Sequence, residues 1–177
     1  MGTTQAIILG DIDSDGDLDI VVGNTGSHNK SYLNNGNGTF AVGRNITSEI
    51  YATRAIGLGD INGDGTLDII VGNHNDEVNT FYLNDGNGSF GIEHNISTDT
   101  DSTKSIVLGD IDGDGTLDII TGNDSTQNHI YSRKSFNVES NIGTSIRVDD
   151  GSFPINRILL VPTEVLPINT SIEYYLK

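Results

Sequence analysis

The sequence predicts an all-β protein, in which three four-stranded β-propeller blades (a partial propeller) are followed by the start of a further β-domain. Three observations predict this fold class: a motif that recurs about every 50 residues, apolar runs typical of strands, and many glycine-rich turns. The 177-residue chain contains 22 glycines but only 3 prolines. No long segment has the 3.6-residue apolar period of an amphipathic helix.

The recurring motif defines the repeating unit. Its three copies align without gaps and read LGDIDSDGDLDIVVGN from Leu9, LGDINGDGTLDIIVGN from Leu58 and LGDIDGDGTLDIITGN from Leu108. A second motif follows in the same phase, as YLNNGNGTF from Tyr32 and YLNDGNGSF from Tyr82, and its third copy is reduced to YSRKSF. Four-stranded units of this length, stacked around an axis, form a β-propeller.

The second unit shows how each unit is expected to fold. Residues 54–59 form a first strand, the acidic loop 60–68 follows, and residues 67–71 and 79–83 form the second and third strands. The Asp-Gly-Asn-Gly turn at 85–88 then leads to a fourth strand at 89–96. The second strand is apolar on both faces beyond its aspartate, which is typical of a strand that is covered on both sides.

Composition changes near residue 140, which predicts two parts in the chain. Residues 1–139 contain the three repeats, and residues 140–177 form a partial, β-rich C-terminal segment. The repeat stops there, and Pro154, Pro162 and Pro167 stand among short alternating apolar runs. A segment this short cannot bury a core of its own, so we expect it to begin another β-domain.

Each unit carries an acidic loop between its first and second strands. Oxygen donors stand at loop positions 1, 3, 5, 7 and 9, and glycine stands at position 6. So many carboxylates in one turn are unfavourable unless a cation lies among them, and hard oxygen ligands at alternate positions suit Ca²⁺. The candidate ligands are Asp11, Asp13, Asp15, Asp17 and Asp19 in the first loop; Asp60, Asn62, Asp64, Thr66 and Asp68 in the second; and Asp110, Asp112, Asp114, Thr116 and Asp118 in the third. The residue at position 7 would contribute its backbone carbonyl, and about three Ca²⁺ per chain are expected.

An acidic loop of this kind has two other interpretations, an EF-hand and a solvated turn. An EF-hand would place a glutamate at position 12 and helices on both flanks, whereas this chain has Val22, Val71 or Thr121 there and strands on the flanks. Solvated acidic turns without an ion are the other alternative. Three copies in register, all with the same donor positions, favour metal binding over this second alternative.

The units resemble FG-GAP/VCBS repeats, the blades of integrin α-subunit propellers and of many secreted bacterial proteins. The resemblance covers roughly residues 5–139 and rests on the GDxxxDGxLDIxxGN core and the YLNxGNGxF hairpin. It implies four-stranded blades, calcium in the loop between the first and second strands, and an extracellular or cell-surface location. Asn62 is a neutral donor, so the second site is expected to be weaker. Three blades cannot close a ring, so we expect missing blades from a parent chain or self-association.

Charge and motif content restrict the function. Lys and Arg total 9 against 25 Asp and Glu, a formal net charge of -16, which argues against a nucleic acid partner and against membrane insertion. With no cysteine, nucleophile elbow or phosphate loop, no enzymatic activity is expected. The prediction is a calcium-binding repeat segment of an extracellular adhesion or ligand-binding protein, with an unidentified protein or glycan ligand. The alternatives are a carbohydrate-binding lectin propeller and a non-catalytic array attached to a secreted hydrolase or lyase.

Overall fold

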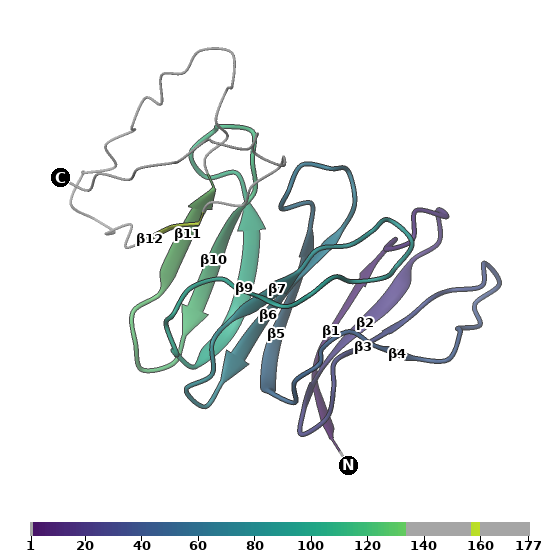
Figure 1. Ribbon diagram of the computed structural model, residues 1–177, viewed down its shortest axis with the longest axis horizontal. Coiled ribbons are helices and arrows are strands. Elements are labelled where there is room, and N and C mark those ends of the chain that lie inside the picture. The colour runs from purple at the N-terminus through teal and green to yellow at the C-terminus, as the bar shows by residue number, and fades with distance from the viewer. Residues whose placement is uncertain (1, 134–156, 160–177) are drawn as a thin grey trace, which may run out of the picture.

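The structure, a computed structural model, describes residues 2–133 and 157–159, and these residues form strands and turns without a helix (Figure 1). The strands are β1 (Thr3–Gly10), β2 (Asp19–Thr25), β3 (Lys30–Tyr32), β4 (Arg44–Asn45), β5 (Ala52–Gly59), β6 (Asp68–His74), β7 (Thr80–Tyr82), β8 (His94–Asn95), β9 (Thr103–Gly109), β10 (Asp118–Asn123), β11 (His129–Arg133) and β12 (Arg157–Leu159). The all-β prediction is therefore confirmed for the described residues.

Consecutive strands pair in each repeat. In the first repeat, residues 3–45, β1 to β4 pair in order and antiparallel, and β5 to β8 do the same in the second repeat, residues 52–95. In the third repeat, residues 103–133, β9, β10 and β11 pair antiparallel, but β12 joins β11 in parallel. The third repeat thus departs from the pattern of the other two. Apart from β12, the segment 140–177 lies outside the described residues.

The strand positions agree with the predicted ones except at the fourth strand. The segment 89–96 was expected to form a strand, but only β8 pairs with β7, and an isolated bridge joins Asn84 to Phe90. In the intervening chain, Gly91 N donates to the carbonyl oxygen of Leu83 at 2.8 Å, but Ile92 is exposed. The fourth strand is consequently much shorter than the sequence pattern predicts.

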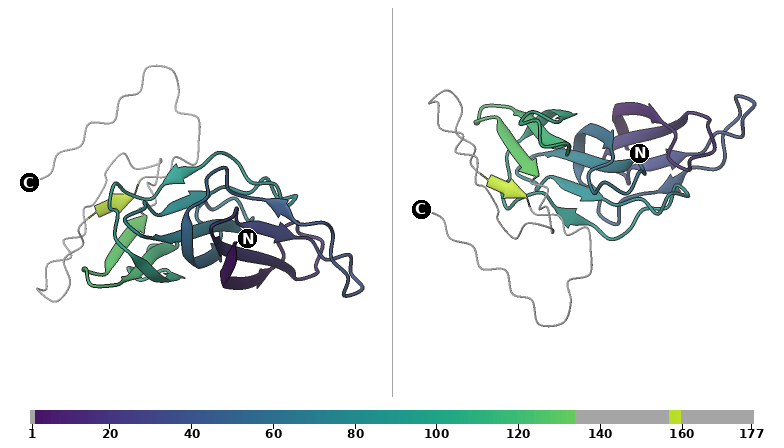
Figure 2. Two further views of the ribbon diagram at one scale, coloured as in Figure 1. Left: turned by 90° about the horizontal axis from the view of Figure 1, so that it is seen from below. Right: turned by 90° about the horizontal axis from the view of Figure 1, so that it is seen from above.

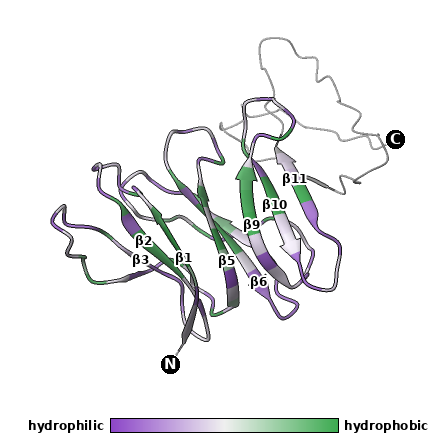
Figure 3. Cartoon of the chain, turned by 180° about the vertical axis from the view of Figure 1, so that it is seen from behind, coloured by the Kyte–Doolittle hydropathy of each residue, from purple (hydrophilic) through white to green (hydrophobic). Residues whose placement is uncertain are grey.

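The repeats stack side by side, and the second lies between the other two (Figure 2). Hydrophobic residues are concentrated on strands such as β1, β5 and β9, whereas the connecting turns are of mixed hydropathy (Figure 3). One buried cluster joins the first repeat to the second, and its members include Ile12, Val21, Ile56, Ile69 and Tyr82. A second cluster joins the second repeat to the third through residues such as Ile61, Ile70, Phe81, Ile119 and Tyr131. The hydrophobic core therefore lies between repeats.

Burial of the strands follows from this stacking. In the second repeat, β6 is buried along nearly its whole length, as predicted for a strand covered on both sides. In the first repeat, β1 is mostly exposed, and Ile7 and Leu9 face solvent. β5, the equivalent of β1 in the second repeat, is mostly buried, whereas β9, its equivalent in the third repeat, is mostly exposed or half-buried. The first strand of a repeat is thus mostly buried only in the repeat that has a neighbour on each side.

Candidate metal-binding loops

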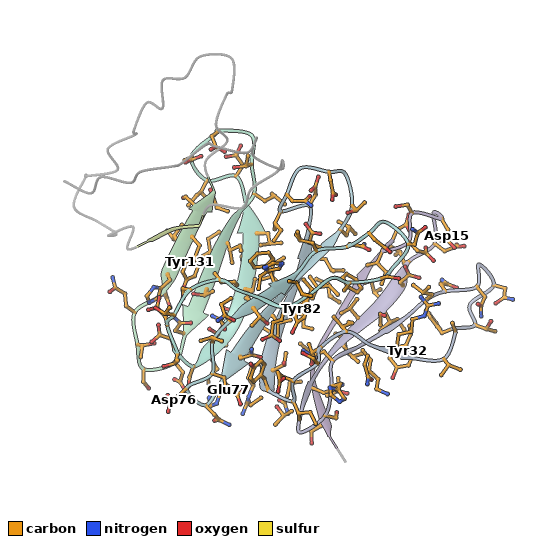
Figure 4. The ribbon with its side chains drawn as sticks, viewed as in Figure 1. Asp15, Tyr32, Asp76, Glu77, Tyr82 and Tyr131 are labelled. Atoms are coloured by element: carbon orange, nitrogen blue, oxygen red, sulfur yellow. The ribbon has the colours of Figure 1, made fainter. Side chains whose placement is uncertain are left out.

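The three acidic loops connect β1 to β2, β5 to β6 and β9 to β10, all at one end of the strands. Figure 4 places Asp15 at this end, while Asp76 and Glu77 in the β6–β7 turn lie at the opposite end. Glycine at loop position 6 has a positive φ in every copy, at 94° for Gly16, 89° for Gly65 and 85° for Gly115. The sharp turn that the sequence predicts at this position is therefore present three times.

The aspartate at loop position 1 organises the turn. In the second loop, Asp60 Oδ1 accepts hydrogen bonds from the backbone N–H groups of Gly63 and Asp64, at 2.6 and 3.1 Å, and its Oδ2 accepts one from Gly65 at 2.9 Å. Asp110 makes the equivalent bonds in the third loop. These bonds hold the loop backbone in a closed turn around the carboxylate.

The aspartate at position 9 fastens the loop to the rest of its repeat. Asp68 is fully buried, and its two carboxylate oxygens accept hydrogen bonds from the backbone N–H groups of Ile61, at 3.0 Å, and Asn84, at 2.9 Å. Asp19 accepts the equivalent pair in the first repeat. Burial raises the pKa of Asp68 to about 6, although the two N–H donors act in the opposite direction.

In the metal-free protein, the Asp68 carboxyl group is expected to titrate near pH 6, because burial raises its pKa from 3.8 to about 6. Between these two values the folded chain binds more protons than the unfolded chain, so this group's contribution to stability falls as the pH rises. A bound cation favours the carboxylate and would cancel the shift. Carbon NMR of the side chain in chelator, assigned with Asp68→Asn, measures the pKa. A midpoint below about pH 4 would contradict this account.

Two of the loops bring three carboxylates together. Oxygen atoms of Asp11, Asp13 and Asp15 all lie within 4.8 Å of one another, and so do those of Asp110, Asp112 and Asp118. In the second loop, by contrast, Asn62 Nδ2 donates a hydrogen bond to Asp64 Oδ2 at 2.6 Å. The amide at position 3 thus satisfies one of the carboxylates that a cation would otherwise neutralise.

The first loop contains an unsatisfied carboxylate oxygen. Asp13 Oδ1 is buried and has no hydrogen-bond partner among the described residues. Burial, followed by the neighbouring Asp19 and Asp15 carboxylates, raises the pKa of Asp13 above its usual value. A buried acceptor beside other carboxylates is costly unless a positive charge joins it. The donor set of this loop, made only of oxygen atoms, therefore fits a hard cation.

The side chains at position 7 are engaged within the protein. Thr66 Oγ1 and Thr116 Oγ1 donate to the carboxylates of Asp64 and Asp114, both at 2.6 Å. Asp17 in the first loop lies against Gly36 of the following hairpin, where an added Cβ would stand 2.8 Å from Asp17 Oδ2. The two threonine side chains thus point to the position 5 carboxylates, and the backbone carbonyl of position 7 stays a predicted ligand.

Loop position 4 is a structural position that the sequence analysis missed. Its φ is positive in all three loops, at 62° for Ser14, 79° for Gly63 and 75° for Gly113. Glycine in two of the three copies is the signal that could have identified it. Ser14 is the exception, a residue with a Cβ in a conformation that favours glycine.

A buried network of asparagine and threonine side chains, here called the Asn/Thr ladder, was also missed. Between the first and second repeats, Asn29 accepts a hydrogen bond from Asn24 N, at 2.7 Å, and donates to Thr53 Oγ1, at 3.0 Å. Between the second and third, Asn79 accepts from Asn73 N and donates to Thr103 Oγ1, both at 2.8 Å. The ladder therefore joins the repeats through polar contacts as well as apolar ones.

A polar pocket of about 410 Å³ lies between the second and third repeats, at the end of the strands opposite the acidic loops. Its lining combines His74, at the end of β6, with acidic and hydroxyl side chains from three turns, namely Asp76, Thr100, Asp101, Ser102, Asp124, Ser125 and Thr126. Such groups can accept and donate hydrogen bonds to a polyhydroxylated molecule.

None of the described residues belongs to a helix that is long and apolar enough to cross a membrane. No curated protein matches the sequence significantly. Among solved structures, the chain is similar to a lectin of Agrocybe aegerita, described as specifically recognising non-reducing terminal N-acetylglucosamine. The TM-score is 0.51 and the identity 24%, and the match covers 67% of this chain and 33% of the lectin chain. This chain thus spans about a third of the lectin's length, and the likeness concerns the fold.

The sequence model of the FG-GAP-like repeat matches residues 11–71 and 60–121. Each match begins at the first aspartate of one acidic loop and ends within the second strand of the following repeat. The two matches together span most of the three stacked repeats and contain all three loops. The chain therefore belongs to the family of FG-GAP-like repeat proteins.

Proposed function

We propose that the chain is a calcium-binding β-propeller segment of an extracellular adhesion or ligand-binding protein, with three four-stranded blades, a structural Ca²⁺ in each acidic loop and no enzymatic activity. The observation that carries this proposal is the buried, unsatisfied Oδ1 of Asp13, which lies among other carboxylates. A cation there would satisfy the orphaned acceptor and offset both the burial and the carboxylate repulsion that raise the pKa of Asp13.

The ions would act on structure and not on a bound substrate. Each loop joins the first two strands of its repeat, and its position 9 aspartate is already fixed by backbone donors. Positions 1, 3 and 5 are the exposed or half-buried part of the loop, so an ion there would tie the tip of the turn to its base. A rigid row of such turns would present neighbouring surface loops to a ligand.

Calcium titration of chelator-treated protein is the direct test, and calorimetry is expected to show about three sites, the weakest in the second loop. Asp15→Ala and Asp114→Ala should each remove a strong site, whereas Asp64→Ala should remove the weaker one, because Asn62 is neutral and already bonded to Asp64. Asp76→Asn, which removes one exposed charge at the opposite end of the strands, is the matched control. Heat of binding that is unchanged in all three loop variants would reject the proposal.

A glycan ligand is a second candidate for the binding function. The structural similarity to an N-acetylglucosamine-binding lectin and the polar pocket between the second and third repeats both favour it. The two carboxylates of Asp101 and Asp124 would accept hydrogen bonds from sugar hydroxyl groups. A glycan array that includes terminal N-acetylglucosamine, repeated with Asp101→Asn, distinguishes this candidate from a protein ligand.

A further inference from the structure

We propose that the two end faces of the chain bind each other, so that a second copy docks head-to-tail through the contacts that already join neighbouring repeats. The head face is the outer side of the first repeat and includes Thr4, Ile7, Leu9 and Leu18. The tail face is the outer side of the third repeat and includes Gly109, Ile111 and Asn128. This interface does not depend on the identity of the ligand or on the proposed function.

The chain forms the underlying apolar contact twice. A glycine at the end of the first strand of one repeat receives two leucines of the next repeat. A Cβ at Gly10 would stand 2.7 Å from Leu58 and 3.0 Å from Leu67, and one at Gly59 would stand 2.7 Å from Leu108 and 2.9 Å from Leu117. The ends of the two leucine side chains therefore pack into the space that the missing Cβ leaves open.

Each end face presents one half of this contact. Leu9 and Leu18, the equivalents of Leu58 and Leu67, are each 56% exposed. Gly109, the equivalent of Gly10 and Gly59, has no described atom within 4 Å of its added Cβ. The leucine pair of one copy therefore matches the open glycine of another.

The isoleucine directly after the first aspartate of each loop shows the same difference between the tail face and the contacts inside the chain. Ile12 and Ile61 are 0% and 2% exposed, because the following repeat covers each of them. Ile111, the third member of the set, is 51% exposed. Among the residues that the structure describes, the tail face thus lacks the neighbour that the first two repeats have.

The Asn/Thr ladder gives a polar counterpart to these apolar contacts. Asn29 and Asn79 each donate a side-chain N–H to the threonine of the next repeat. Asn128, their equivalent on the tail face, accepts a bond from Asn123 N at 2.9 Å, and its amide has no acceptor recorded among the described residues. Thr4, the equivalent of Thr53 and Thr103, stands on the head face and donates to Asn24 Oδ1 at 2.9 Å. Its hydroxyl lone pairs could accept the Asn128 amide of another copy.

A second copy carries both faces, so one kind of molecule can satisfy all of these features. The faces differ from each other and are complementary, so the contact is heterologous and gives a ring or an open array. The exposed apolar side chains would be buried on docking, whereas the formal net charge of -16 opposes association and must be screened by salt or cations.

Analytical ultracentrifugation of the full chain in calcium and physiological salt tests the proposal. The wild type is expected to associate at micromolar concentration, whereas Leu9→Glu and Ile111→Glu should each remain monomeric. An equimolar mixture of these two variants should give a heterodimer, because one keeps an intact tail face and the other an intact head face. Val42→Glu, at a loop residue that is 91% exposed, is the control and should associate like the wild type.

Cross-linking provides a second readout, since the chain contains no cysteine. An added Cβ at Gly59 lies 3.9 Å from Leu108 Cβ, which is suitable for a disulfide. Gly59→Cys with Leu108→Cys should therefore close an intramolecular disulfide. By equivalence, a mixture of Leu9→Cys and Gly109→Cys chains should form a mixed dimer faster than either forms with itself. A monomeric wild type at high micromolar concentration, or no preference for the mixed dimer, would overturn the proposal.

Discussion

Removal of calcium is expected to lower the melting temperature of the chain sharply, because each acidic loop concentrates carboxylates that repel one another without an ion. If each site has a dissociation constant of about 10 μM, millimolar Ca²⁺ contributes roughly 2–3 kcal/mol per site to the free energy of unfolding. Three sites then account for a large share of the stability of a domain of this size. Thermal unfolding in Ca²⁺ and in excess chelator measures the difference.

Two controls separate specific binding from general screening of the acidic chain. Sodium chloride at matched ionic strength should restore little of the lost stability, because it screens charge without coordinating the loops. Mg²⁺ should restore less than Ca²⁺, since it requires an octahedral site and gives up its water reluctantly. An identical melting curve with and without chelator, for protein shown to be metal-free, would eliminate calcium as a structural component.

The strand order was predictable because the same sequence pattern occurs three times in the chain. β5, β6 and β7 begin and end within a few residues of the predicted bounds. The length of the fourth strand was not predictable, because only two residues after the hairpin, His94 and Asn95, pair with β7. The difference in burial between β1 and β5, the equivalent first strands of two repeats, was also beyond the sequence pattern, because their patterns are similar and their neighbouring repeats differ.

The candidate metal loops were predictable in outline. Donor spacing and the glycine at position 6 follow from local sequence, and the positive φ of Gly16 confirms the predicted turn. The bond from Asn84 N to Asp68 could not be read from the loop, because the two residues meet only after β6 and β7 have paired. The same holds for Asn84 Nδ2, which donates to the carbonyl oxygen of Ile12 in the preceding repeat, at 2.8 Å. Contacts between repeats require the stacked structure.

The second large effect is the loss of stability expected when the Asn/Thr ladder is broken. Asn79→Ala is expected to lower the free energy of unfolding by about 2–4 kcal/mol, because it removes two buried hydrogen bonds and leaves the N–H of Asn73 without its acceptor. Asn79 is nearly fully buried between the second and third repeats, so water cannot replace the lost side chain without a rearrangement. Urea unfolding in calcium, at the lowest usable protein concentration, measures the loss.

Equivalent positions in the other repeats provide matched comparisons for this variant. Asn29→Ala should cost about as much as Asn79→Ala, because Asn29 is equally buried and makes the same two bonds. Asn128→Ala should cost less than about 1 kcal/mol in the monomer, since Asn128 is exposed and water can solvate the groups left behind. Equal losses at Asn79 and Asn128 would show that the ladder stabilises each repeat from within, and that burial between repeats adds nothing to it.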